Sequence, residues 1–163
     1  MKICQIVGYK NSGKTTVMKE VIRYFSSRGY KIGSLKHHGH GGEPELMKDT
    51  DSYQHFAAGT MASGVQGEHV SQLILNNTEF ETLISIYKML PIDILFIEGY
   101  KKADYPKIVL LKNEEELSLL DELSNIIAVG SWDEQILRNV SHPAFSIANI
   151  GSYLPQLADY ITE

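Results

Sequence analysis

The stretch KICQIVGYKNSGKTT, residues 2–16, decides the fold. Its first six residues are mostly apolar and predict a short strand over 2–7. The nine residues from Gly8 include seven glycines, lysines and hydroxyl residues, which cannot form a core. Apolar side chains then recur at helical spacing over 14–28. A strand, a glycine-rich loop and an amphipathic helix, in that order, predict a phosphate-binding loop.

The loop matches the P-loop pattern Gly8-x-x-x-x-Gly13-Lys14-Thr15. Both glycines allow close backbone approach that a Cβ would block, so that successive N–H groups can surround an anion. Lys14 supplies a positive charge for the outer phosphates, and the Thr15 hydroxyl can bind Mg²⁺. A chance match in a glycine-rich turn is the alternative, but the flanking strand and helix favour nucleotide binding.

Glu98 ends a second informative stretch, DILFIEG, in which residues 94–97 are all apolar. A continuous apolar run predicts a central parallel strand that is buried on both faces. Its carboxylate would then lie at the carboxyl end of the sheet, where open α/β folds bind their ligands. We therefore expect Glu98 to hold Mg²⁺ or its water shell, although an acid that merely begins a solvated loop would read the same way.

The stretch KHHGHGGEPELMKDTDSYQHF, residues 36–56, holds four of the six histidines and permits three interpretations. A switch-like loop would reach the γ-phosphate and Mg²⁺ through Lys36, His37 and Asp51. A transition-metal site would use the histidines of H-H-x-H, although this spacing matches no closed metal site and no cysteine assists it. The third is a solvated polar loop. The histidines concerned are His37, His38 and His40.

Strands that alternate with helices predict an α/β three-layer fold with a mostly parallel sheet and a single domain over 1–163. A capping box is expected at Thr78 and Glu81, and turns at Gly64 and Gly67. Strands are expected over 2–7, 30–35, 62–76 (one or two), 92–100, 107–111 and 125–130, and helices over 14–28, 51–59, from Phe80 to Pro91 and over 149–162.

Composition narrows the function classes. The net charge of −5 argues against a broad nucleic-acid-binding surface. The apolar runs are too short for a membrane span and nothing resembles a signal peptide, so a cytoplasmic protein is expected. The single cysteine, Cys4, lies within the first apolar run and is expected to be a buried, inert thiol.

Several linked motifs resemble one known family. The P-loop, LKHHGH, KDTDSY, AAGT, ILFIEGYK and PKIVLL follow the order and spacing of the MobB family, the GTP-binding adaptor proteins of molybdopterin-guanine dinucleotide biosynthesis. The resemblance is firmest over 2–60 and 93–111 and loose beyond Glu114. It implies a P-loop NTPase-like fold, GTP with Mg²⁺, slow hydrolysis at most and a homodimer. It also implies a partner, the guanylyltransferase that joins GMP to molybdopterin.

The resemblance carries the family's site residues onto this chain. The family's Walker B acid corresponds to Glu98. The family's Lys-His pair corresponds to Lys36 and His37, and its D-S-Y segment begins at Asp51. The family's phosphate loop corresponds to Gly8, Lys10, Asn11, Ser12, Gly13, Lys14, Thr15 and Thr16.

Two features limit what the residues alone support. The usual guanine-reading motif, N-K-x-D, is absent, so the expectation that the nucleotide is a guanine nucleotide rests on the resemblance alone. The chain has only three arginines and no evident arginine finger, which predicts weak hydrolysis and disfavours a small-molecule kinase. A GTPase metallochaperone that carries nickel or zinc on the histidine loop stays open as the alternative function.

Overall fold

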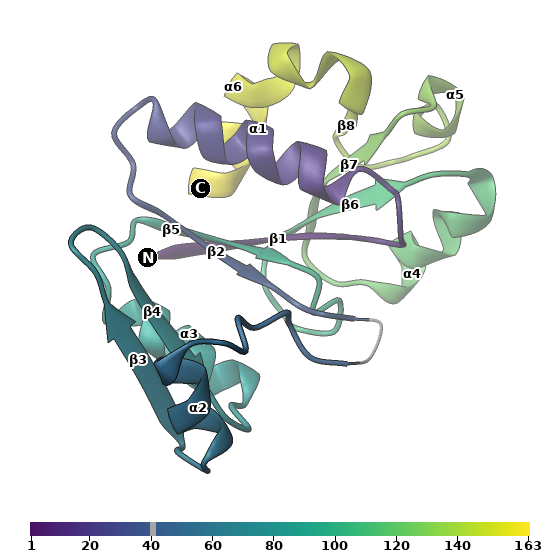
Figure 1. Cartoon of the computed structure of the whole chain (residues 1–163). Coiled ribbons are helices and arrows are strands. Elements are labelled where there is room, and N and C mark those ends of the chain that lie inside the picture. The colour runs from purple at the N-terminus through teal and green to yellow at the C-terminus, as the bar shows by residue number, and fades with distance from the viewer. Residues whose placement is uncertain (40–41) are drawn as a thin grey trace. The chain divides into compact units, whose positions relative to one another are not determined.

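The computed structural model describes residues 1–39 and 42–163, and the chain divides into two compact units (Figure 1). The first unit consists of Met1–Gly39 and Leu90–Glu163, and the second falls within His40–Met89. The single domain predicted over 1–163 stays a prediction.

The first unit is built on a six-stranded sheet in which every neighbouring pair of strands is parallel. The strand order is β2-β5-β1-β6-β7-β8. β5 and β6 are buried along their whole length, as continuous apolar runs in a central parallel strand require. The strands are β1 (Lys2–Gly8), β2 (Ile32–Lys36), β5 (Ile94–Glu98), β6 (Lys107–Leu111), β7 (Ile126–Ser131) and β8 (Ala144–Ser146).

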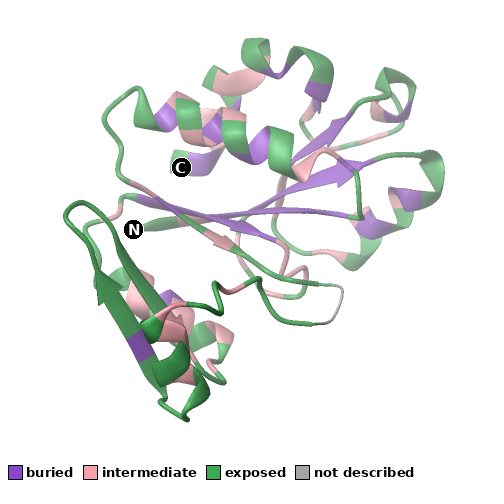
Figure 2. Ribbon diagram, in the orientation of Figure 1, coloured by how far each residue is buried: buried purple, intermediate pink, exposed green. Residues whose placement is uncertain are grey.

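Apolar side chains pack on both faces of this sheet. Cys4 and Ile6 of β1 point into a core shared with α1 (Lys14–Ser26) and α6 (Ile150–Thr162). Val7 points the opposite way, into a second core shared with α4 (Leu119–Glu122) and α5 (Glu134–Leu137). The result is the predicted three-layer, P-loop NTPase-like α/β fold, and Figure 2 shows burial concentrated on its strands. Two 3₁₀ turns, η1 (Glu114–Ser118) and η2 (Ile147–Asn149), complete the described elements of this unit.

The second unit contains the antiparallel hairpin of β3 (Ala62–Gln66) and β4 (Ser71–Leu75), together with α2 (Asp51–Ala57) and α3 (Phe80–Lys88). The hairpin is mostly exposed (Figure 2). The hydroxyl of Ser63 donates to the Ser52 carbonyl over 2.6 Å and joins β3 to α2.

Two local predictions within this unit are wrong. Gly64 lies inside β3, and only Gly67 lies in the turn, where its N–H donates to the Val70 carbonyl. The Thr78 hydroxyl donates to the Asn76 carbonyl instead of capping α3, whose N-cap is Glu79. In the first unit, helix α1 ends at Ser26, two residues before the predicted end at 28.

Among the helices in the described part of the chain, none is both long and apolar enough to cross a bilayer.

Candidate nucleotide-binding site

The loop from Gly8 to Lys14 has the backbone geometry that its glycines predict. Gly8, Asn11 and Gly13 all have positive φ, at 156°, 64° and 100°. A Cβ on Gly8 would lie 2.6 Å from the Leu110 carbonyl oxygen and 2.5 Å from Ser12 Oγ. The loop therefore curls tightly between β1 and α1, which is the path that lets N–H groups converge on an anion.

The loop's polar side chains differ in exposure. Ser12 is fully buried, and its hydroxyl has no hydrogen-bond partner among the described residues. It packs against Gly8 and supports the loop from within. The side chains open to a ligand are those of Lys10, Asn11, Thr15 and Thr16, all of which are exposed.

Lys14 lies folded over the loop. Its Nζ donates to the carbonyls of Tyr9 and Gly8 over 2.7 and 3.1 Å. Burial lowers the pKa of Lys14, and the Glu98 carboxylate opposes that shift, while Lys101 and Lys36 add to it. The Glu116 carboxylate opposes the shift as well, so three ammonium groups stand against two carboxylates, and the excess of positive charge suits an anionic ligand.

Glu98 ends β5 at the carboxyl edge of the sheet, directly opposite Lys36 of β2. Glu98 is 9% exposed, and its carboxylate lies 3.4 Å from Lys36 Nζ. Gly99 follows with φ +96°, and a Cβ there would lie 3.0 Å from His37 Cβ. The Glu98 carbonyl accepts from the His37 N–H over 2.9 Å, so the chain brings Lys36, His37 and Glu98 together at this edge.

Three residues near this edge were missed by the sequence analysis. Gln5 Nε2 donates to the carbonyls of Gly99 and Tyr100 and holds the turn after β5. The Tyr100 ring lies 4.4 Å from the His37 ring, centroid to centroid. Lys101 Nζ lies 3.6 Å from the centroid of the Tyr9 ring, a cation–π contact above the phosphate loop. The polar run GYK directly after Glu98 was a signal for Tyr100 and Lys101, whereas Gln5 lies within the first apolar run and had none.

The remaining sequence-predicted ligands are Asp51, His38 and His40. Asp51 is the first residue of α2 in the second unit, where its charge favours the helix N-terminus, and its role at a metal stays a prediction. His37 and His38 are exposed, and His40 lies outside the described residues. No group of three or more His, Cys, Asp or Glu side chains among the described residues could hold a metal ion. The nickel or zinc metallochaperone gains no support from this part of the chain.

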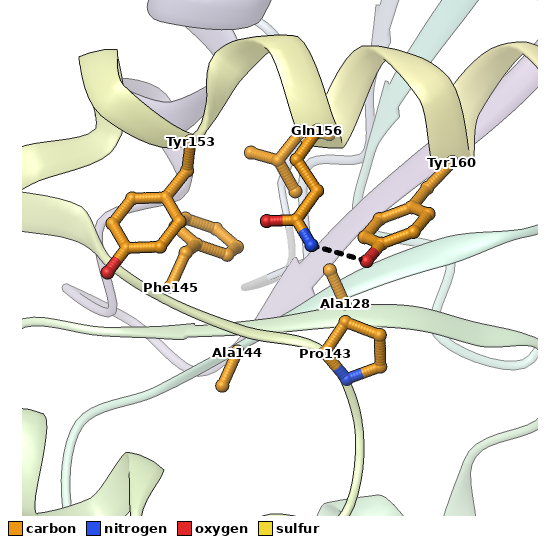
Figure 3. A pocket seen from close by; sticks show the side chains of 8 residues that line it. Ala128, Pro143, Ala144, Phe145, Tyr153, Gln156 and Tyr160 are labelled. Atoms are coloured by element: carbon orange, nitrogen blue, oxygen red, sulfur yellow. Dashed lines mark hydrogen bonds between the residues drawn. The ribbon is translucent and has the colours of Figure 1, made fainter.

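A small hollow away from the phosphate loop lies between α6 and the β8 edge of the sheet (Figure 3). Tyr153 and Tyr160 of α6 flank Gln156, whose Nε2 donates to the Tyr160 hydroxyl over 2.7 Å. The volume of this hollow, about 10 Å³, is near the minimum for one water molecule, and no charged side chain lines the hollow. It cannot hold a phosphate, so the P-loop is the better ligand site.

Comparisons with known proteins agree with this geometry. The sequence model of the MobB family, described as molybdopterin guanine dinucleotide synthesis protein B, matches residues 3–132. A probable molybdopterin-guanine dinucleotide biosynthesis adapter protein of Bacillus subtilis (strain 168) is 47% identical over 147 residues, which are 88% of this chain and 84% of the relative. The crystal structure of Bacillus subtilis MobB superposes with a TM-score of 0.81 at 35% identity, covering 99% and 98% of the two chains. A MobB homolog from Bacillus stearothermophilus gives 0.78 at 31% identity, covering 99% of each chain.

Proposed function

The chain belongs to the MobB family, and from this premise we propose that it is a GTP-binding adaptor protein of molybdopterin-guanine dinucleotide biosynthesis. In this role it holds GTP with Mg²⁺, hydrolyses it slowly at most and assists the guanylyltransferase that joins GMP to molybdopterin. We further propose that it works as a cytoplasmic homodimer.

The observation that carries the proposal is the charge arrangement around the P-loop. The ammonium groups of Lys36 and Lys101 and the carboxylates of Glu98 and Glu116 all act on the Lys14 ammonium, so the loop carries an excess of positive charge, and Lys36 Nζ lies 3.4 Å from Glu98. In the described structure the hydrogen bonds of Lys14 Nζ go only to neutral carbonyl oxygens, and a phosphate can replace these as a charged, stronger acceptor. The residues present therefore fit a polyphosphate group.

The same edge offers hard oxygen ligands for Mg²⁺. Thr15 lies in the first turn of α1 and is exposed. Glu98 lies at the end of β5, which pairs with β1, the strand that leads into the phosphate loop. Hydroxyl and carboxylate oxygens are ligands that Mg²⁺ prefers in nucleotide sites. When bound, the ion would neutralise charge on the outer phosphates.

Slow hydrolysis follows from the positions of the arginines. Arg23 pairs with Glu20 on α1 over 2.8 Å, and the Arg28 guanidinium lies 3.4 Å from the centroid of the Tyr24 ring. Both are engaged along the far part of α1 and not at the phosphate loop, and the third arginine, Arg138, is the exposed C-cap of α5. An arginine finger accelerates hydrolysis by about 10³- to 10⁵-fold, so a chain without one holds the triphosphate for long periods. Such a protein suits presentation of a nucleotide to a partner better than rapid turnover.

The decisive experiment compares the wild type with Lys14→Ala. Calorimetry with a non-hydrolysable GTP analogue and Mg²⁺ should show binding that is lost in the variant, with an unchanged thermal melt. In a reconstituted assay with the guanylyltransferase, molybdopterin, molybdate and GTP, the wild type should stimulate cofactor formation and Lys14→Ala should not. Lys19→Ala, an exposed change on α1, is the matched control. Equal stimulation by wild type and Lys14→Ala would show that the nucleotide site is not the working part of the adaptor.

A further inference from the structure

The turn that follows β7, Ser131–Glu134, lies against the phosphate loop. The Trp132 indole Nε1 is 2.8 Å from the position that a Gly13 Cβ would occupy. Trp132 nevertheless remains 49% exposed. A half-exposed indole therefore borders the loop that is proposed to hold the phosphates.

Hydrogen bonds hold this turn in place. The buried hydroxyl of Ser131 donates to the Leu111 carbonyl over 2.8 Å and accepts from the Asp133 N–H over 3.0 Å. The Asp133 carboxylate accepts from the Gln135 N–H over 2.9 Å and caps α5. These bonds hold the backbone on both sides of Trp132, so the residue is placed beside the phosphate loop before any ligand binds.

An exposed aromatic face beside a nucleotide site is suited to stacking on a base. Tyr9, in the phosphate loop itself, is also an exposed aromatic residue, but the Lys101 ammonium already lies over its ring. The Trp132 ring has no recorded aromatic or cation–π contact among the described residues. Trp132 is therefore the better stacking surface.

Glu134 stands two residues after Trp132, in the first turn of α5, and is exposed. Its carboxylate has no hydrogen bond or ion pair within the described part of the chain, whereas the Asp133 carboxylate is engaged as a cap. Guanine presents two adjacent donors, N1–H and the N2 amino group, which a carboxylate can accept together. Adenine presents an acceptor at N1 and would leave the carboxylate without this pair of bonds.

We propose that Ser131–Glu134 is the nucleobase subsite of this protein, in which Trp132 stacks on the base and Glu134 reads guanine. This subsite replaces the N-K-x-D motif that the chain lacks. The inference rests on the proposed function, since it requires a nucleotide on the P-loop.

Intrinsic fluorescence and calorimetry together test the stacking residue. Trp132 is the only tryptophan, so its emission reports this subsite alone. GTP with Mg²⁺ should quench the emission more strongly than inorganic tripolyphosphate, which can occupy only the phosphate loop. Trp132→Ala should weaken GTP binding about 5- to 150-fold and leave tripolyphosphate binding within about twofold of wild type. Trp132→Phe should restore most of the loss, and Leu90→Ala, which removes an equally exposed apolar side chain, should have no effect.

The guanine-reading role is tested by base preference. Glu134→Gln should reduce the preference for GTP over ATP about tenfold or more, because one charged acceptor is lost. Glu81→Gln is the matched control, since it changes an exposed glutamate in the first turn of α3.

The outcomes separate this inference from the proposed function. If Trp132→Ala weakens GTP and tripolyphosphate equally, Trp132 only supports the loop and the stacking role is overturned. An unchanged GTP-to-ATP ratio in Glu134→Gln overturns the reading role. If wild type binds neither GTP nor tripolyphosphate, the P-loop function fails and the subsite fails with it.

Discussion

Lys36 and Glu98 face each other across β2 and β5, with Nζ and Oε1 3.4 Å apart at the carboxyl edge of the sheet. The pair gives the nearly buried Glu98 carboxylate a counter-charge in the absence of ligand. Mg²⁺ at this carboxylate would repel the ammonium, which could then turn toward a phosphate. The two residues are thus placed to exchange partners when nucleotide and metal bind together.

Lys36→Met should weaken triphosphate binding in Mg²⁺ by roughly 10- to 100-fold, because one charged hydrogen bond to phosphate is removed. Its effect on GDP should be smaller if Lys36 serves the γ-phosphate. The free energy of unfolding should fall by no more than about 1 kcal/mol, since the lysine side chain is 64% exposed. Calorimetry with a GTP analogue and GDP, beside a urea titration, checks this. Equal losses for the two nucleotides would place Lys36 away from the γ-phosphate.

Thr15→Ala and Glu98→Gln should each weaken Mg²⁺-dependent GTP binding by about tenfold or more, since each removes a hard oxygen at or near the ion. Without Mg²⁺, Thr15→Ala should have little effect. Glu98→Gln should then bind as well as wild type or better, because a negative charge has left the phosphate site. Titrations with and without EDTA measure both conditions. Losses of the same size in both would show that neither residue acts through the ion.

Gly13→Ala should destabilise the fold by about 1–3 kcal/mol and abolish GTP binding. The added Cβ meets Trp132 Nε1 at 2.8 Å on a backbone with φ +100°. Gly151→Ala is the control, because Gly151 lies in α6 and a Cβ there meets nothing within 4 Å. That change should stabilise the fold by about 0.5–1 kcal/mol. Urea unfolding of both variants is the measurement, and a stable Gly13→Ala that binds GTP would contradict the tight loop.

Lys107→Met should destabilise the first unit by about 3 kcal/mol or more. The fully buried Lys107 ammonium donates to the carbonyls of Ala103, Tyr105 and Ser124 over 2.8–3.0 Å. Methionine fills the space but forms none of these three bonds from a charged donor, each of which contributes about 1 kcal/mol or more. Chemical denaturation measures the change, with the exposed Lys102→Met as control. A loss no larger than in that control would argue against the buried bonds.

Cys4 should resist thiol reagents in the native protein at pH 8 and react fully once the chain unfolds. Burial raises the pKa of Cys4 to about 12, against an ordinary value of roughly 8.5. The folded state favours the neutral thiol of Cys4. The contribution of Cys4 to the free energy of unfolding is therefore complete below the pKa of the unfolded chain and is lost as the pH rises toward 12. The difference in unfolding free energy between wild type and Cys4→Ala should therefore shrink above about pH 9. A difference that stays constant up to pH 11 would contradict this linkage.

Local sequence was sufficient for the long elements with strong patterns. Strand β1, helix α1 and strand β5 lie within two residues of their predicted ends, because apolar periodicity and the glycines at 8, 13 and 29 act over short distances. The elements α4, α5 and β8 were not predicted. Each has only three or four residues, too few to show a period, and each is held by packing or pairing with β7 or the second core.

The sequence by itself determined the P-loop, the buried strand that leads to Glu98 and the α/β class, because each depends on residue types at short, fixed spacing. The tertiary structure alone decided that Lys101 lies over Tyr9, that Lys36 pairs with Glu98 and that Trp132 abuts Gly13. These pairs are separated by 62 to 119 positions along the chain. These residues lie at or just after the carboxyl ends of their strands. Only the strand order β2-β5-β1-β6-β7 and its parallel registers bring those strand ends to one edge of the sheet.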